Sequence, residues 1–446
     1  MTTPGPSADT GATSRLPRRR FSRRGTFWSA AAVLALCLWS SGAPSVLYPI
    51  YAAEWNLPAV VITSVFATYP VALLIVLLLF GSISDTLGRR RTMMLGIALF
   101  TLAALVFAVA PNVGFLYLGR VLQGIGVGFA LGAASAALVE NNPSANPRLA
   151  STLTTVSTAT GLTVALVLSG VLAEYAPLPL VLSFLVLFAL SAVTLVAVWR
   201  TPSDVGRSGG GGAGIRETDA SGSSDGGRGG TSPARVSWRP KPMRLAPGIL
   251  LPFAAATTSV AVAYAVGAIF LSLGAQMARD LSGTTDLLVI GLLLGISSLA
   301  IGVTALFLSR VHAHLAILIG GALSLVSLAL MALAAATGSL GLFLAWCVVG
   351  GIAYSFSFTG GIGVINRAAS ATHRGGTLSL LYLFAYLLQA LVAVGAGALA
   401  TAIGLGAAVD VAAPLVGVFA LAAVLLAALD LGSARRRRAA ALSPSA

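Results

Sequence analysis

Twelve long apolar runs constrain this chain more than any other feature of its sequence. A helix needs about 20 mostly apolar residues to cross the hydrocarbon core of a bilayer. The runs cover residues 27–50, 60–83, 93–110, 113–139, 150–172 and 178–198 and, after a polar gap, residues 249–277, 287–308, 315–336, 340–362, 376–402 and 411–429. We therefore predict an all-α membrane protein with twelve transmembrane helices.

The composition excludes an ordinary soluble domain. Only 9% of the 446 residues are charged and 57% are hydrophobic, whereas about 25% of the residues of soluble proteins are charged. The formal net charge of +14 would suit a nucleic-acid-binding protein. The arginines, however, gather at the termini, in the polar gap and in short loops, so we expect the lipid bilayer as partner and no nucleic acid.

The basic residues occupy every second loop, and this alternation predicts the orientation in the membrane. Basic residues follow the even-numbered runs, as at Arg89, Arg148, Arg310 and Arg367, and they also crowd both ends of the chain. The other loops carry mainly Glu54, Glu174, Arg279, Asp280, Asp286 and Asp410. Cytoplasmic loops are enriched in lysine and arginine, so we expect both termini in the cytoplasm and a multi-pass protein of the bacterial inner membrane.

The polar gap divides the chain into two sets of six runs. We expect a basic tail over residues 1–26, a first six-helix bundle over 27–200 and a second over 248–431. Residues 201–247 are rich in glycine, serine and arginine, which is typical of a flexible linker. A basic tail over residues 432–446 completes the prediction.

A short motif lies where the second run meets its basic loop. It comprises Gly81, Asp85, Gly88, Arg89 and Arg90. A carboxylate at a membrane boundary usually has a partner, and glycine allows a tight turn. The residues alone are also consistent with a plain basic loop.

A second motif places a charge inside the fourth run. Arg120 is followed by Gln123 and Gly124 in an otherwise apolar stretch. An arginine at the centre of a membrane helix costs about 2.5–3.5 kcal/mol on insertion scales. Arg120 therefore requires a polar cavity or a partner, unless it reaches the headgroups at the membrane surface.

Both motifs resemble signatures of the major facilitator superfamily, the first between spans two and three and the second in span four. The resemblance implies two pseudo-symmetric six-helix bundles that alternate access to a central cavity. It implies that Asp85, with Gly81, Gly88, Arg89 and Arg90, controls the conformational change through the start of span eleven. It also implies that Arg120, Gln123 and Gly124 face the cavity or take part in proton coupling.

In this family the cavity lies between the two bundles, so we expect polar and aromatic residues near the middle of the spans to line it. The candidates are Trp39, Tyr69, Tyr264, Tyr354, Tyr386 and Gln389. Aromatic residues with few charges suit a neutral or amphipathic organic substrate. We expect Tyr48 and Tyr51, near the end of the first span, to belong to the aromatic belt at the membrane surface.

The resemblance implies a secondary-active transporter, and we expect proton-coupled efflux of a small organic molecule by a monomer. The efflux type of this family has a proline in span five where this chain has Leu166. Proton-coupled uptake of a nutrient and a non-transporting membrane sensor therefore stay open as alternatives. No catalytic, nucleotide-binding or metal-ligating pattern appears, so we expect neither an enzyme nor a cofactor other than the proton gradient.

Overall fold

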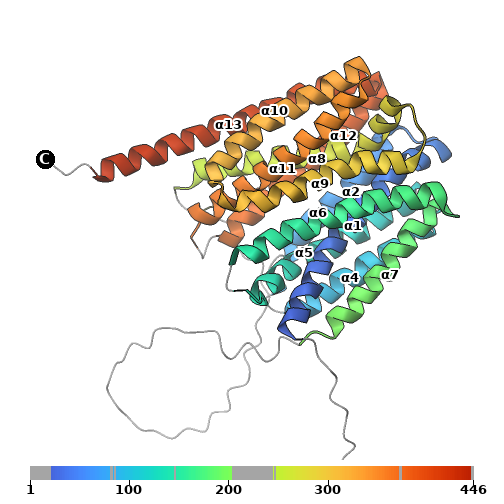
Figure 1. The fold of residues 1–446 in the computed structure, drawn as a ribbon, viewed down its shortest axis with the longest axis horizontal. Coiled ribbons are helices and arrows are strands. Elements are labelled where there is room, and N and C mark those ends of the chain that lie inside the picture. Colours follow the sequence, from blue (N-terminus) through green and yellow to red (C-terminus); the bar gives the residue numbers. More distant parts are fainter. Residues whose placement is uncertain are drawn as a thin grey trace, which may run out of the picture.

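The computed structural model describes residues 22–80, 84, 87–144, 147–202, 245, 248–370 and 374–442. In this part of the chain, twelve helices are long and apolar enough to cross a membrane, and the prediction of twelve spans is confirmed. The helices run side by side as two groups, the first half of the chain below and the second half above in Figure 1. Residues 1–21 of the predicted N-terminal tail and most of the linker lie outside the described residues, while the last residues of that tail belong to the first helix, which begins at Arg23.

The first bundle contains six helices. They are α1 (Arg23–Glu54), α2 (Ala59–Phe80), α4 (Arg89–Ala108), α5 (Val113–Glu140), α6 (Pro147–Tyr175) and α7 (Pro179–Trp199). Within this bundle α5 packs against α1, α2 and α4, and α6 packs against α1.

The second bundle repeats the arrangement. Its helices are α8 (Leu250–Ser282), α9 (Leu287–Phe307), α10 (Ala313–Thr337), α11 (Leu340–Ala368), α12 (Arg374–Ile403) and α13 (Leu405–Leu442), with a short 3-10 turn η2 (Leu308–Arg310) after α9. Helix α11 packs against α8, α9 and α10, which mirrors the position of α5 in the first bundle.

Polar residues and glycines set the ends of these helices. The side chain of Asn112 accepts a hydrogen bond from the amide of Gly114 at the start of α5, at 3.0 Å, and Asp286 caps α9 in the same way. Side-chain caps of this kind satisfy backbone groups that the helix itself leaves open. Gly404 separates α12 from α13 with φ of +84°, a conformation that favours glycine. Helix α13 thus begins at Leu405, six residues before the predicted run at 411.

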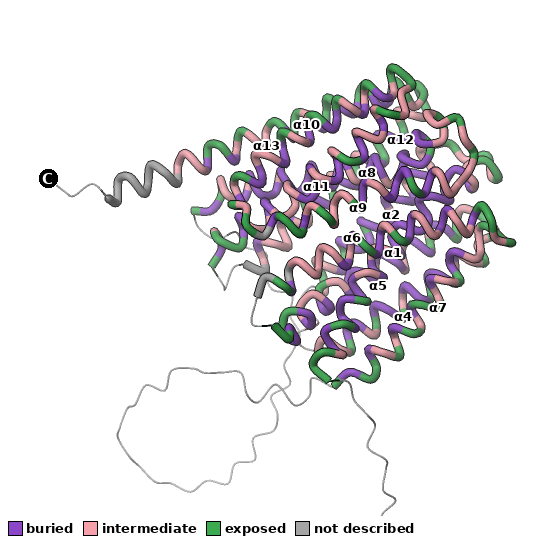
Figure 2. The backbone as a smooth tube through the Cα atoms, viewed as in Figure 1, coloured by how far each residue is buried: buried purple, intermediate pink, exposed green. Residues whose placement is uncertain are grey.

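The outer surface of the two bundles is apolar, as a lipid-facing surface requires. Large hydrophobic side chains stand exposed on it, including Val193 at 68%, Leu250 at 69% and Phe307 at 73%. Figure 2 shows buried residues concentrated along the inner faces of the helices, with intermediate and exposed ones outside. The bilayer would cover these exposed side chains, since a soluble protein rarely exposes apolar patches of this extent.

The two bundles meet along two helix pairs, α6 with α9 and α2 with α12. Small residues allow the first pair to approach closely: a Cβ on Gly291 would lie 2.5 Å from the carbonyl oxygen of Leu166, and one on Gly170 would lie 2.4 Å from that of Leu287. Close backbone approach through small residues is a common means of packing membrane helices.

We call the end of the molecule that carries Arg89, Arg90 and Arg310 the basic end, and the opposite end the far end. The bundles are tied together at the far end. The amide of Val60 donates to Thr401 Oγ1 at 2.9 Å, and the amide of Leu287 donates to Glu174 Oε2 at 2.9 Å. A Cβ on Gly397 would lie 1.8 Å from Thr63 Oγ1. The far end is therefore closed by contacts between the bundles.

We predict that Gly397→Ala weakens this closure, because the added methyl group overlaps Thr63. Overpacking typically costs about 1–3 kcal/mol, so the open fraction of the far end should rise at least about fivefold. A cysteine at Ser272, which is only 4% exposed, would report this as faster labelling by a membrane-impermeant maleimide, after replacement of the free cysteines Cys37 and Cys347 by alanine.

Gly395→Ala is the matched control, because a Cβ at Gly395 meets nothing within 4 Å. It should leave the labelling rate unchanged. Equal rates for the two alanine variants would contradict the closure that we assign to Gly397.

Candidate functional site

A cavity of about 510 Å³ lies between the two bundles. Its walls come from α1, α2, α5 and α6 of the first bundle and from α8, α9, α11 and α12 of the second. It runs from mid-membrane, at Ser41 and Gln389, toward the basic end, at Leu77 and Leu378. The cavity is therefore placed where one bundle can move against the other, on the side opposite the closed far end.

Aromatic rings of the second bundle dominate the cavity. The rings of Tyr264 and Tyr386 lie 4.9 Å apart between centroids. Tyr264 and Tyr354 are nearly parallel at 6.1 Å, and Phe358 lies 6.0 Å from Tyr354. Tyr382 lies 6.1 Å from Tyr386. Offset or tilted rings at these separations attract one another, so they form a continuous aromatic wall.

Five of the six residues predicted for a substrate cavity line this space: Tyr69, Tyr264, Tyr354, Tyr386 and Gln389. Trp39 is not among the residues that line it, and its side chain packs against the buried core instead. That the five lining residues bind a substrate stays a prediction.

Arg120 does not line the cavity but is fully enclosed, with 0% exposure. Its Nε donates to the hydroxyl of Tyr48 at 3.0 Å, and Nη2 donates to the same hydroxyl. Nη1 donates to the carbonyl oxygen of Ser41 at 3.0 Å and to Gln123 Oε1 at 3.1 Å. Of the carboxylates that the structure describes, none pairs with it. Neutral acceptors thus satisfy a buried charge, which is costly without them.

Aromatic faces complete the surroundings of Arg120. Its guanidinium carbon lies 5.5 Å from the ring centroid of Tyr48 and 5.9 Å from those of Phe66 and Tyr69. A cation over a ring face is attracted by the ring's quadrupole, more strongly when both are desolvated. Tyr69 also lines the cavity, so one ring is shared by the arginine and the cavity wall.

A proline in α1 supplies part of this network. Pro44 has no amide hydrogen, so the carbonyl of Ser40, four residues earlier, has no helical donor. Gln123 Nε2 donates to that carbonyl oxygen at 2.7 Å. Gln123 therefore bridges the broken turn of α1 to Arg120 on its own helix, and it is itself buried.

Gly124 acts through packing rather than by facing the cavity. A Cβ at this position would lie 2.5 Å from the carbonyl oxygen of Tyr69 and 2.7 Å from the Cβ of Ala72. Glycine thus permits α5 and α2 to cross in contact. The crossing brings the ring of Tyr69 to its place between Arg120 and the cavity.

The prediction that Tyr48 and Tyr51 belong to a surface belt is wrong. Tyr48 is 2% exposed and Tyr51 is 1% exposed. The sequence contains a signal for this difference, because Pro44 and Pro49 interrupt the hydrogen bonding of α1 and such helices usually pack against groups that satisfy the freed carbonyls.

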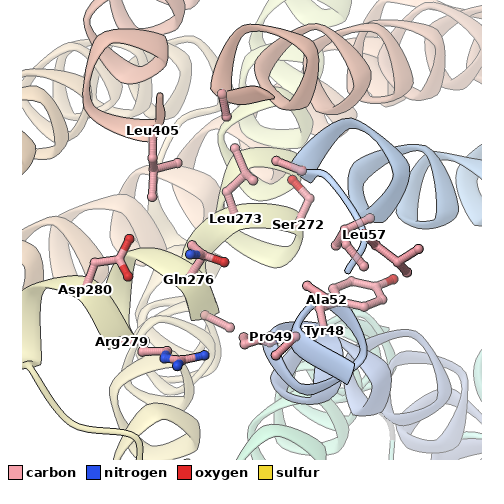
Figure 3. Close-up of a pocket in the computed structure, with 15 residues that line it drawn as sticks. Tyr48, Pro49, Ala52, Leu57, Ser272, Leu273, Gln276, Arg279, Asp280 and Leu405 are labelled. Atoms are coloured by element: carbon pink, nitrogen blue, oxygen red, sulfur yellow. The ribbon is translucent and has the colours of Figure 1, made fainter. Parts of the chain in front are cut away.

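A second pocket of about 490 Å³ lies at the far end, between the same two bundles. Figure 3 shows Gln276, Arg279 and Asp280 of α8 across from Tyr48 and Pro49 of α1. Tyr48 lines this far-end pocket, while Ser41 lines the central cavity. Arg120 hydrogen-bonds to both residues. The network of Arg120 thus forms part of the wall between the two spaces.

The motif at the basic end joins helices of the first bundle. Gly88 precedes α4 with φ of +89°. Arg89 pairs with Glu140 at the end of α5, with 3.2 Å between Nε and Oε1, and Arg90 donates to the carbonyl oxygen of Trp199 at the end of α7. Gly81 and Asp85 lie outside the described residues. The control of conformational change by this motif stays a prediction.

The segment around Leu166 serves helix packing. A Cβ on Gly161 would lie 2.0 Å from the carbonyl oxygen of Ala35 on α1, and Leu166 and Gly170 meet α9 as described above. These small residues therefore place α6 between α1 of its own bundle and α9 of the other.

Comparison with known proteins identifies the family. The sequence profile of the Major Facilitator Superfamily matches residues 27–316, more than half of the 446-residue chain. The chain belongs to the Major Facilitator Superfamily. The chain is thus a multi-pass membrane transporter for a small-molecule substrate rather than an enzyme. Members of this family work by secondary-active transport.

Relatives of this facilitator match it over short stretches only. It is 36% identical over 99 residues to the uncharacterized transporter EfpA of Mycobacterium tuberculosis, covering 22% of this chain and 19% of that protein. It is 42% identical over 71 residues to D-xylose-proton symporter-like 2 of Arabidopsis thaliana, covering 15% and 14%. It is 45% identical over 74 residues to the puromycin resistance protein pur8 of Streptomyces alboniger, covering 17% and 14%. Each alignment spans less than a fifth of the relative's length.

Solved structures match the facilitator over nearly its whole length. A bacterial homologue of the human lysosomal transporter Spinster, inward-facing and unoccupied, is 16% identical with a TM-score of 0.67, covering 91% of this chain and 97% of that one. A variant of the nucleoside transporter NupG is 14% identical with a TM-score of 0.67, covering 91% and 99%. At these identities the likeness establishes the fold, and the expected two six-helix bundles are confirmed.

We predict that Tyr48→Phe destabilises the protein, because Arg120 loses the hydroxyl that accepts from two of its nitrogens. Loss of a hydrogen bond to a charged group costs about 1.5–3 kcal/mol. Thermal unfolding in detergent measures the change as a lower midpoint.

Tyr51→Phe is the control on the same helix. The hydroxyl of Tyr51 is buried and has no hydrogen-bond partner among the described residues, so its removal should be neutral or stabilising. Equal losses for both phenylalanine variants would show that the Arg120 network does not carry the effect.

Proposed function

We propose that this chain exports a small organic molecule in exchange for protons by alternating access, as a monomer in the inner membrane of a bacterium. The observation that carries the proposal is the cavity between the bundles, which runs to the basic end while inter-bundle contacts close the far end. The positive-inside rule assigns the basic end to the cytoplasm. With this orientation, we propose that the structure represents an inward-facing state that accepts its substrate from the cytoplasm.

The chemistry of the cavity supports an organic substrate rather than an ion. Its walls are aromatic and aliphatic with scattered hydroxyl and amide groups, and none of the described residues that line it is charged. The positive charge of Arg120 contacts this wall from behind, through Ser41 and Tyr69. We propose that a proton or substrate entering the cavity is sensed through this network.

A single chain supplies both sides of the cavity, which supports the proposal that the protein works as a monomer. The resemblance over short stretches to a puromycin resistance protein supports efflux. The similarity to a D-xylose-proton symporter-like protein supports the alternative, proton-coupled uptake. A non-transporting sensor with this fold is the remaining alternative.

Flux in oriented membrane vesicles separates these functions. A proton gradient is imposed across everted and right-side-out vesicles that contain the protein. Uptake of a panel of radiolabelled neutral aromatic solutes is then measured, with D-xylose in parallel. We expect an aromatic solute to accumulate in everted vesicles that are acidic inside, and Arg120→Ala to abolish this accumulation because it removes the network beside the cavity.

Vesicles that lack the protein are the control for passive entry. Accumulation of D-xylose in right-side-out vesicles under an inward proton gradient would instead establish uptake. No movement of any solute under either gradient would contradict transport and favour the sensor.

A further inference from the structure

The central cavity concentrates one residue type. Five of the nine tyrosines of the chain line it, together with Phe270, Trp346 and Phe358. No charged side chain is among the described residues that line it. A charged ligand would lose its hydration there without a counter-charge, which is costly. The cavity thus favours an uncharged, flat molecule that can lie against aromatic rings.

Two buried polar atoms in this wall, Ser298 Oγ and Gln389 Oε1, have no hydrogen-bond partner among the described residues. Gln389 is 9% exposed, and its Oε1 is buried without a hydrogen bond to any described residue. Leaving a buried polar atom unsatisfied costs free energy that a ligand can recover on binding.

The position of Gln389 fits a ligand that enters from the basic end. Leu378, Tyr382, Tyr386 and Gln389 recur at helical spacing on α12, and all four line the cavity. With a rise of 1.5 Å per residue, Gln389 lies roughly 16 Å deeper than Leu378. It is one turn beyond Tyr386, whose ring packs on Tyr264 at 4.9 Å. The amide thus lies directly past the aromatic wall.

We propose that the cavity binds an uncharged planar heteroaromatic ring whose edge carries a hydrogen-bond donor beside an acceptor. The side-chain amide of Gln389 would form hydrogen bonds with this edge. A glutamine amide offers one acceptor and two donors in a plane, and it pairs in two-point fashion with such an edge, as it does with adenine. The rings of Tyr264, Tyr354 and Tyr386 would stack on the ligand. The proposal rests on the proposed function, because it names the substrate class of the same cavity.

Adenosine and two of its analogues provide the test. N6,N6-dimethyladenosine lacks the N–H donors. 7-deazaadenosine lacks the acceptor N7 but keeps N1, so it tests pairing through the N6/N7 edge, which is the edge that glutamine contacts in adenine. Both analogues keep the ring size. Binding to the purified full-length protein is measured by titration calorimetry. We expect adenosine to bind about tenfold or more tightly than either analogue, since a two-point pair discriminates by this amount.

Gln389→Met keeps the length of the side chain but removes the amide, so it should bind the three nucleosides with equal affinity. Gln276→Met is the matched control, because Gln276 lies in the far-end pocket and should leave the preference intact. The ligand comparison on the unaltered protein decides the matter even where Gln389→Met does not fold.

Equal binding of the three nucleosides by the unaltered protein, or no binding of adenosine, overturns the proposal. Either result leaves the vesicle assay free to show transport of another solute. The predicted binding pattern without flux of any solute under either gradient would support the ligand class and contradict the proposed transport instead.

Discussion

The enclosure of Arg120 is the constraint on which the centre of this molecule depends. A guanidinium removed from water needs acceptors for its donors, and among the described residues neutral groups provide them without a carboxylate. Pro44 frees the carbonyl of Ser40 for Gln123, and Ser41 and Tyr48 complete the set. These hydrogen bonds fix α1 against α5. Because Ser41 and Tyr48 face different pockets, the same bonds help to separate the central cavity from the far-end pocket.

Small residues let the bundles approach each other closely. Gly170 and Gly291 let α6 meet α9 at backbone distance, and Gly397 lets α12 approach the side chain of Thr63 on α2. The carboxylate of Glu174 adds one hydrogen bond across the bundles, from the amide of Leu287. Contacts through small residues hold without desolvating ions, so one bundle can leave the other at modest cost. The Arg89–Glu140 ion pair and the hydrogen bond between His314 and Asp430 each lie within one bundle. These contacts therefore stiffen the bundles, and the contacts through small residues permit motion between them.

Hydropathy predicted the spans because a bilayer requires length and apolarity of every crossing helix, whatever its neighbours. Arg120 was evident as the charge inside an apolar run. Its partner Tyr48 was not, because a position near the end of α1 is equally consistent with a surface belt. Tyr264, Tyr386 and Gln389 were found from mid-span position and polarity. The prediction that Trp39 lines the cavity failed because the sequence does not give the rotation of α1 about its axis. Leu38 and Ser41 line the cavity, and Trp39 points about 100° away from Leu38 around the helix.

We propose that the two bundles move against each other about the central cavity, so that one end of the molecule opens as the other closes. Spin labels at Val109 and Ala407 span the far end, and labels at Val139 and Asn366 span the basic end. Double electron–electron resonance in lipid nanodiscs measures the distance within each labelled pair, one pair per variant, as the pH is lowered. The account predicts that the far-end distance lengthens as the basic-end distance shortens. Distances that stay fixed, or that change together in the same direction, would contradict it.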